Sequence, residues 1–305
     1  MTNSLSEQNS DQDQRPSDDF STKVKDKFIA FVDILGFKNM VDAAEQTGGD
    51  MRHLIELTRM LGSNSDSQKF TRYGPTICPH STYISRDLDF KVTQISDCVV
   101  VSAESSPAGL INLIHHCFGI AINLLAKGHL CRGVITRGNI LHSDSQFMGT
   151  GYADAYKNEQ HVSVFRVDEK ERGTPFIQVA SPVVVYVSTL KDDCVRKMFA
   201  RMTDSDGTYT AISPFRALGN APSAIVGPDF DPHAMKASCQ RSRKLRLDNL
   251  GMFEKSEADA DDQTKAKIAH YKKGLLHVIA RLDEKERKLD RMIETGQIPY
   301  GSTFL

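Results

Sequence analysis

The chain has 305 residues, of which 40% are hydrophobic and 25% charged, a composition typical of globular proteins. Its 38 Lys and Arg residues nearly balance 39 Asp and Glu residues, and the net charge of −1 argues against nucleic acid or an anionic membrane as a partner. Apolar stretches such as Val183–Val187 are far shorter than the ~20 residues of a membrane span, and six cysteines without a CxxC pair indicate reduced thiols, so we expect a soluble, cytoplasmic protein.

The N-terminal part of the chain predicts a tail followed by a strand and helices. Residues 1–23 are rich in Ser, Gln, Asn and Asp, which predicts a mobile tail outside the fold. The run FIAFVDI, which begins at Phe28, is short and consists mainly of β-branched and aromatic residues, so it predicts a buried strand. A helical region is expected through Met60, and a further strand over residues 81–87.

A β-hairpin is expected next, with strands over residues 90–95 and 98–102 and with Ser96 and Asp97 in its tight turn. Pro107 then favours the start of a helix whose sequence is apolar nearly all round, so it should pack deeply against the sheet. The segment CRGVITRGNIL follows as a strand. The order strand, helix, strand, strand, helix, strand is that of ferredoxin-like domains.

Later elements are expected to extend this sheet. They are a helix over GYADAYKNEQ, strands near residues 176–180 and 209–212, and a helix near residues 192–202. We therefore predict an α+β domain over residues 24–225, with a ferredoxin-like βαββαβ core in an extended mixed or antiparallel sheet. Residues 226–305 are predicted to form a C-terminal helical extension.

This extension contains two long helical patterns, separated by the acidic segment EKSEADADD, and therefore predicts a helical hairpin. In the second pattern hydrophobic residues recur every seven positions, at Ile268, Leu275, Leu282 and Leu289. Such a seam either packs on its own domain or pairs two copies of the chain. The sequence leaves both alternatives open.

Two carboxylates stand at the ends of predicted core strands, Asp33 in FVDILGF and Asp97 in the turn of QISDCVV. A charge that closes an apolar strand needs compensation, and two such groups on this strand plan form an oxygen site suited to Mg²⁺ or Mn²⁺. The residues after Asp33 lead from the strand into a helix whose free N–H groups could bind phosphate. They are Ile34, Leu35, Gly36 and Phe37.

Four motifs in this order, FVDILGF, ISDCVVVS, RGVITRGNI and GYADAYKNE, resemble those of class III nucleotidyl cyclases, and most closely the pyrimidine cyclases of bacterial Pycsar antiphage defence. The resemblance covers roughly residues 27–187. It implies that Asp33, Ile34 and Asp97 hold two Mn²⁺ or Mg²⁺ ions, which activate the ribose 3′-hydroxyl of UTP and give 3′,5′-cyclic UMP and pyrophosphate. It also implies a homodimer with shared active sites, and a separate effector that the second messenger activates.

The resemblance assigns base reading to Thr93 and Gln146, and these match neither the adenine-reading nor the guanine-reading pair of the family. They therefore favour a pyrimidine, with UTP as the expected substrate and CTP as the nearest alternative. Two other classes of protein are alternatives to a pyrimidine cyclase. A catalytically silent cyclase-like domain would bind nucleotide or a partner, whereas a ferredoxin-like RNA-binding module is disfavoured because RGVITRGNI carries no aromatic residue.

The positive charge at the site departs from the family pattern. Lys157 stands where the family has the Arg that stabilises the transition state, and Ala153 stands where it has Asn. Because Lys lacks the planar guanidinium fork, Arg132 or Arg137 could take over this role. Their spacing of five residues puts them on opposite faces of a regular strand, so only one can serve, and we favour Arg137.

Overall fold

The computed structural model describes residues 23–63, 65–66, 74–75, 77–78, 81, 88–218 and 230–298. The predicted tail, nearly all of the predicted strand over residues 81–87, and the predicted domain boundary at residue 225 lie outside the described residues.

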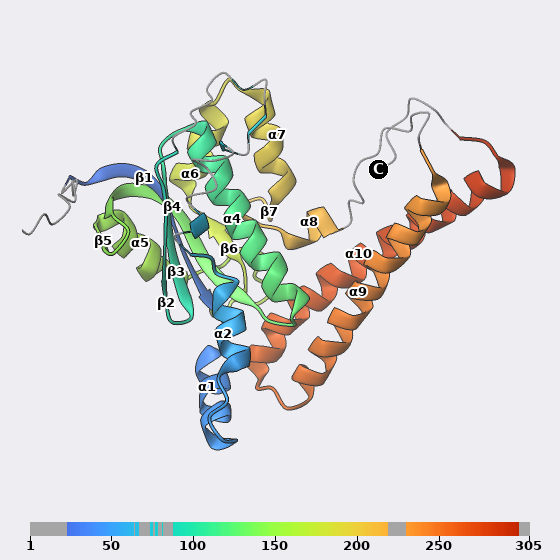
Figure 1. The fold of residues 1–305 in the computed structure, drawn as a ribbon, viewed down its shortest axis with the longest axis horizontal. Coiled ribbons are helices and arrows are strands. Elements are labelled where there is room, and N and C mark those ends of the chain that lie inside the picture. The colour runs from blue at the N-terminus through green and yellow to red at the C-terminus, as the bar shows by residue number, and fades with distance from the viewer. Residues whose placement is uncertain are drawn as a thin grey trace, which may run out of the picture.

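The central part of the sheet has four strands, β1 (Lys25–Ile34), β2 (Phe90–Ile95), β3 (Cys98–Glu104) and β4 (Cys131–His142). They lie in the order β2-β3-β1-β4, and each neighbouring pair is antiparallel (Figure 1). This is the order of a ferredoxin-like βαββαβ unit, so the predicted core is confirmed.

Shorter strands extend the sheet beyond β4. Strand β6 (Ile177–Val179) runs parallel to β4, and β8 (Thr210–Ile212) and β7 (Thr203–Ser205) follow as antiparallel neighbours. Strand β5 (Phe147–Met148) pairs with the end of β4. The result is a mixed eight-stranded sheet, which confirms the α+β class. Neither β5 nor β7 was expected, because Phe147–Met148 has only two residues and Thr203–Ser205 is entirely polar, so neither shows an apolar strand pattern.

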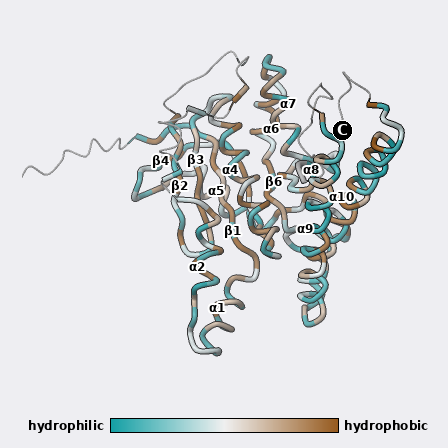
Figure 2. Tube along the Cα trace, turned by 45° about the vertical axis from the view of Figure 1, so that its right-hand side comes forward, coloured by the Kyte–Doolittle hydropathy of each residue, from teal (hydrophilic) through white to brown (hydrophobic). Residues whose placement is uncertain are grey.

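Helices cover one face of the sheet, with α4 (Pro107–Ala126) at the centre (Figure 1). This helix is long and apolar enough to cross a membrane, but 67% of its apolar window is buried inside the fold, which is compatible with a soluble protein. Figure 2 shows that hydrophobic residues gather in the strands and in α4. The same apolar core includes side chains from four other helices: α1 (Phe37–Gln46), α2 (Arg52–Arg59), α6 (Ser181–Thr189) and α7 (Asp193–Met202).

Helix α5 (Thr150–Glu159) covers part of the opposite face, where Ile29, Phe31 and Val100 form a smaller core with Ala155. The helix lies very close to the sheet. A Cβ atom on Gly151 would lie 2.5 Å from the Ile29 side chain and 2.9 Å from the Gly138 backbone. A glycine is therefore needed at this contact, which explains Gly151 without any ligand.

The C-terminal extension is a hairpin of two long helices, α9 (Pro232–Ala258) and α10 (Asp262–Thr295), as predicted. The acidic segment EKSEADADD was expected to separate the two helices. Instead, α9 continues through most of it, and only residues 259–261 connect α9 to α10. Asp261 ends this connection by accepting a hydrogen bond from the Thr264 N–H at 2.7 Å, which caps α10. A short helix, α8 (Pro214–Leu218), precedes the hairpin in sequence.

The seven-residue seam of α10 packs inside its own chain. Leu275, Leu282 and Leu289 are fully buried, in a cluster that contains Phe253 of α9 and Val134 of β4. Polar contacts join the same elements, since the Tyr271 hydroxyl donates to the Pro175 carbonyl at 3.0 Å and the Asn249 amide donates to the Leu125 carbonyl at 2.9 Å. Of the two alternatives for this seam, the structure therefore shows the packing on its own domain.

This packing predicts that the hairpin and the sheet unfold together. Leu275→Ala is expected to lower the free energy of unfolding by about 2 to 5 kcal/mol, because it removes a fully buried side chain. Leu276→Ala is the matched control, since the neighbouring side chain is 54% exposed and should change stability by less than about 0.5 kcal/mol. Urea unfolding followed by circular dichroism measures both, and equal effects would contradict the shared core.

Candidate active site

Asp33 lies near the end of β1, on the face of the sheet that α5 covers. Side chains alternate along the strand, so Asp33 follows Ile29 and Phe31 on this face. Its neighbours across the sheet are Cys98 on β3 and Arg132 on β4. A half-buried carboxylate thus continues a row of apolar side chains.

Asp97 lies in the two-residue turn between β2 and β3, after Ser96, whose φ of 54° is in the left-handed region. The backbone ties this turn to the end of β1, because the Ile34 N–H donates to the Asp97 carbonyl at 3.1 Å. The structure therefore brings together the two carboxylates that are 64 residues apart in the sequence. This convergence was expected from the strand plan.

The surroundings of Asp33 raise the pKa of its carboxyl group to about 7. Burial is the largest cause, followed by the negative charges of Asp97 and Glu159. A hydrogen bond with Asp97 adds to the shift, whereas the positive charge of Arg132 opposes it. At neutral pH this cluster therefore holds either a proton or a compensating cation.

A divalent cation fits this donor set. Among the described residues no group of three or more His, Cys, Asp or Glu side chains is arranged as a complete metal site. Mg²⁺ and Mn²⁺ do not need one, because they commonly bind one or two carboxylates and complete their shell with water and substrate phosphates. Asp33 and Asp97 supply that minimum. Ile34 could add only its backbone carbonyl, because its side chain is buried and its N–H already bonds to Asp97.

Two of the four residues expected to bind phosphate use their N–H groups for other bonds. The N–H groups of Ile34 and Leu35 are already used, the first by the Asp97 carbonyl and the second by the Leu130 carbonyl at 2.9 Å. They cannot also bind phosphate without breaking these bonds, so the structure does not support this part of the expectation.

The free N–H groups begin at α1. Gly36 precedes this helix with a φ of 77°, a conformation that favours glycine, and no side chain caps the helix. Phe37 is buried and is the first residue of the helix. The amides at this N-terminus, from Phe37 onward, are therefore the phosphate donors that the structure offers beside Asp33.

Arg132 and Arg137 lie on opposite faces of β4, as their spacing predicts. Arg132 pairs across the sheet with Asp33, and its guanidinium forms an ion pair with the buried Glu159 of α5. Arg137 pairs with Phe28, contacts the ring of that residue on the α4 side, and binds Asp26 at 2.6 Å. The structure thus brings Arg132 to the carboxylates and leaves Arg137 behind the sheet, contrary to the preference for Arg137.

Lys267 of α10 was missed by the sequence analysis. Burial lowers the pKa of its ammonium group, and the positive charge of Arg132 contributes, which places the side chain near Arg132 and Glu159. The only sequence signal was an unremarkable Lys in an amphipathic helix, and nothing local linked it to residues more than a hundred positions earlier. The C-terminal extension therefore brings a lysine near the ion pair of Arg132 and Glu159.

Thr93 lies on the same face of the sheet as Asp33, as expected, and it is part of a hydrogen-bonded chain. Its hydroxyl lies 3.0 Å from Nε2 of His142, and Nδ1 of that ring lies 2.8 Å from the Ser102 hydroxyl. Burial, with the nearby positive charges of Lys27 and Lys91, lowers the pKa of His142 to about 4, so the ring is neutral at pH 7. His142 was not among the residues expected at the site, and it orients Thr93 through this hydrogen bond.

Gln146 and Lys157 are both exposed and lie apart from this chain of hydrogen bonds. Gln146 is in the connection before β5, where its carbonyl accepts from the Ser143 N–H at 2.8 Å. Lys157 is on the outer side of α5, one turn after the exposed Ala153. A role for Lys157 at an active site would require a partner subunit to face this side of α5.

Comparison with known proteins adds no assignment: no family model matches the chain, and no curated protein matches it. The interpretation therefore depends on the geometry of the two carboxylates and on the four sequence motifs.

The raised pKa of Asp33 predicts a pH-dependent affinity for Mn²⁺. Because the ion needs the carboxylate and the pKa is about 7, raising the pH from 6 to 8 should increase the affinity by about tenfold. Without metal, the stability of the fold changes with pH in the opposite direction. Asp33 ionises near pH 4 in the unfolded chain and near pH 7 in the folded one, so the free energy of unfolding falls as the pH rises through about 7. Thermal unfolding with and without Mn²⁺ across this range measures both trends, and a stabilisation by Mn²⁺ that does not change with pH would contradict the role of Asp33.

Proposed function

We propose that this protein is a metal-dependent pyrimidine nucleotide cyclase that converts UTP to 3′,5′-cyclic UMP and pyrophosphate. The observation that carries the proposal is the convergence of Asp33 and Asp97, with the pKa of Asp33 raised to about 7, on a ferredoxin-like strand order. Near the two carboxylates lie a helix N-terminus that suits phosphate and the cation Arg132, and Lys267 lies near Arg132 and Glu159.

The residues have distinct roles in this proposal. Asp33 and Asp97 would hold the cations, with the Ile34 carbonyl as a further ligand. Two bound divalent ions would supply the charge that ionises the ribose 3′-hydroxyl and stabilises the departing pyrophosphate. The amides at the start of α1 would orient the phosphates. Thr93, held by a neutral His142, would read the pyrimidine edge, and Gln146 would assist from the exposed connection.

A homodimer with shared sites is part of the proposal, and exposed hydrophobic side chains on the α5 side support it. Ile95 is 47% exposed, Met148 55% and Tyr156 53%. Ile95 lies in the same cross-strand row as Asp33, and the Tyr156 ring packs against Phe31 with centroids 5.3 Å apart. Burying this surface against a second copy would also bring the exposed Lys157 to face a partner's carboxylates.

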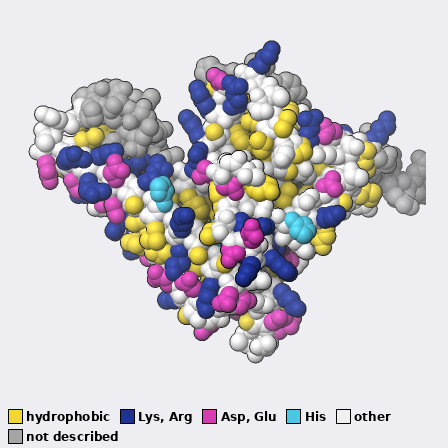
Figure 3. Space-filling model, turned by 180° about the vertical axis from the view of Figure 1, so that it is seen from behind, with side chains coloured by type: hydrophobic (Ala, Val, Ile, Leu, Met, Phe, Trp, Pro, Cys, Tyr) yellow, Lys and Arg dark blue, Asp and Glu magenta, His cyan; other side chains and the backbone are white. Residues whose placement is uncertain are grey.

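In the cell, the enzyme would act in the cytoplasm, where UTP is available. Its product would be a second messenger in antiphage defence that activates a separate effector protein. Figure 3, viewed from the side opposite to Figure 1, shows acidic and basic side chains intermixed over that face. Such a surface suits a small anionic substrate in a local pocket rather than an extended polyanion.

A catalytically silent nucleotide-binding domain is the second candidate, and one observation favours it. Arg132, the cross-strand neighbour of Asp33, is held by Glu159, and Lys157 is exposed, so neither of these two described cations is placed in its own chain to stabilise a transition state at Asp33. The two candidates differ in one measurable property, since only the cyclase releases pyrophosphate.

The test is to incubate the purified protein with Mn²⁺ and each of the four nucleoside triphosphates, and to identify products by chromatography and mass spectrometry. Cyclic UMP from UTP supports the proposal, and cyclic CMP from CTP would change the substrate but not the class of enzyme. Binding of UTP without any cyclic product would support the silent domain instead.

His142→Phe, which removes the partner of Thr93, should weaken discrimination between UTP and CTP.

A further inference from the structure

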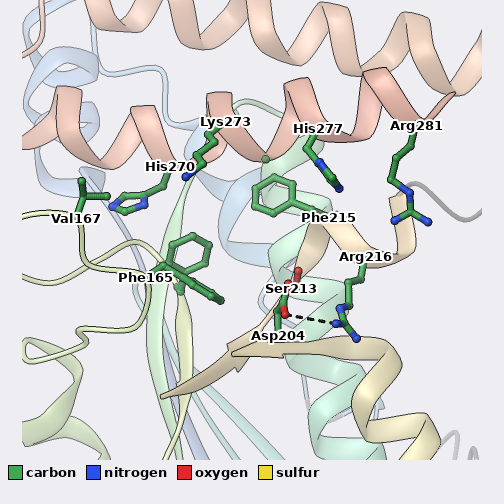
Figure 4. Close-up of a pocket in the computed structure, with 12 residues that line it drawn as sticks. Phe165, Val167, Asp204, Ser213, Phe215, Arg216, His270, Lys273, His277 and Arg281 are labelled. Carbon is green, nitrogen blue, oxygen red and sulfur yellow. Dashed lines mark hydrogen bonds and ion pairs between the residues drawn. The ribbon is translucent and has the colours of Figure 1, made fainter. Parts of the chain in front are cut away.

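A separate cavity of about 470 Å³ lies between α10 and the elements β7, β8 and α8, and none of the predicted site residues lines it (Figure 4). Its volume is within the range of cavities that bind cofactors and other small molecules. It has an aromatic part and a cationic part.

The aromatic part is formed by Phe165, Phe176 and Phe215. Phe165 and Phe176 meet edge to face with centroids 5.1 Å apart. Phe165 has a φ of 60°, a left-handed conformation that is rare for an aromatic residue, and its N–H donates to the Asp206 carboxylate at 2.8 Å. The backbone at Phe165 is thus held in an unfavourable conformation beside the cavity. Such strained residues are found most often at functional and ligand-binding sites.

Phe215 is held by a glycine in the middle of α10. A Cβ atom on Gly274 would lie 2.6 Å from the Phe215 ring, so the ring packs directly on the helix backbone. A glycine inside a helix is unfavourable compared with alanine, and here it allows the close approach of the ring. The Phe215 ring forms a flat wall of the cavity, and its placement therefore depends on the glycine at position 274.

The cationic part lies along the same helix. Lys273, His277 and Arg281 follow at intervals of four residues, so they share one side of α10 and point toward α8 and β7 (Figure 4). Arg216 of α8 faces them and is partly neutralised by Asp204, 3.4 Å away. Within the described part of the chain, no ion pair involves Lys273 or Arg281. The cavity thus has an excess of positive charge.

We propose that this cavity binds a nucleotide, with its phosphates at Lys273 and Arg281 and its base against Phe215 and Phe165. An aromatic wall beside clustered cations is complementary to a planar ring joined to phosphate, and neither a purely apolar ligand nor a simple anion would use both parts. The proposal does not depend on the proposed cyclase activity, because the cavity shares no residue with the carboxylate site.

The test is isothermal titration calorimetry of the full-length protein with ATP and UTP in EDTA, where a metal-dependent site at Asp33 contributes little. We expect saturable binding that Lys273→Glu with Arg281→Glu weakens by at least about tenfold, because phosphate then meets negative charge. Gly274→Ala, which changes no charge, should also weaken binding by displacing Phe215. Lys265→Glu is the matched control, since this exposed lysine of α10 does not line the cavity.

Three outcomes would overturn the proposal. The first is the absence of saturable binding to the wild-type protein. The second is binding that survives both sets of cavity substitutions but is lost in Asp33→Asn, because the nucleotide would then occupy the carboxylate site. The third is equal binding of inorganic triphosphate and ATP with no effect of Gly274→Ala, which would indicate a site for simple anions. Circular dichroism of each variant establishes that it is folded.

Discussion

Asp33→Asn is expected to lower metal-dependent formation of cyclic nucleotide by about a thousandfold or more, because one of the two carboxylates that hold the cations loses its charge. The same substitution should stabilise the metal-free protein. At pH 8 the ionised Asp33 is half-buried beside Asp97 and Glu159, and its neutral replacement removes that repulsion. We expect a gain of about 1 to 2 kcal/mol in the free energy of unfolding, after allowance for solvent screening.

These opposite effects distinguish a functional carboxylate from a structural one. Product formation is measured with Mn²⁺ and UTP, and stability by urea unfolding in EDTA at pH 8. Asp248→Asn is the matched control, because this exposed carboxylate of α9 should change neither quantity. A variant at Asp33 that keeps full turnover, or one that loses stability along with turnover, would remove the argument for a metal site.

Co-expression of Asp97→Ala and Lys157→Ala chains is expected to restore activity that neither variant has alone. If each site takes its carboxylates from one subunit and its lysine from the other, half of the dimers formed at random are mixed, and each mixed dimer has one intact site. Activity should therefore return to about a quarter of the wild-type value. The exposed position of Lys157 on α5 makes this arrangement possible, because the described part of the chain leaves this side chain accessible to a partner.

Pairing Asp33→Asn with Asp97→Ala provides the control, since both changes affect the carboxylate side and a mixed dimer keeps no intact site. Cyclic UMP formation by the co-expressed mixture is the measurement, and the purified, differently tagged mixed dimer alone should reach about half of the wild-type value. If the first mixture is inactive although both chains fold and dimerise, the sites are not shared in this way. If Lys157→Ala alone is fully active, the transition-state role belongs to another cation, with Arg132 the nearest to Asp33.

The core of the fold could be predicted because its strands are long and its patterns are local. The buried run of β1, the hairpin of β2 and β3, and the apolar helix α4 each carry a clear signal in consecutive residues, and together they define the strand order. The short strands β5 and β7 carry none. The extent of α9 was misjudged because acidic residues are compatible with both a linker and a solvated helix face.

The site was predictable where residues are fixed by strand ends and unpredictable where they depend on packing between distant elements. Asp33 and Asp97 follow from the hairpin and the strand order. The choice between Arg132 and Arg137 required the register of β4 against β1, which sequence alternation alone does not provide. Lys267 and the cavity along α10 depend on how the C-terminal hairpin meets the sheet, and no local pattern encodes that contact.

The burial of the α10 seam has a consequence for how the protein is made. Val134 of β4 and Leu289 of α10 belong to the same buried cluster, so this cluster is complete only after the ribosome has added 155 more residues. At ordinary rates of translation this interval lasts roughly 8 to 30 s. Until α10 is made, Phe176 lacks the ring of Tyr271 on which it stacks. A chain truncated before α10 should therefore aggregate, and synthesis of the last helix marks the point at which the candidate active site acquires its final neighbour, Lys267.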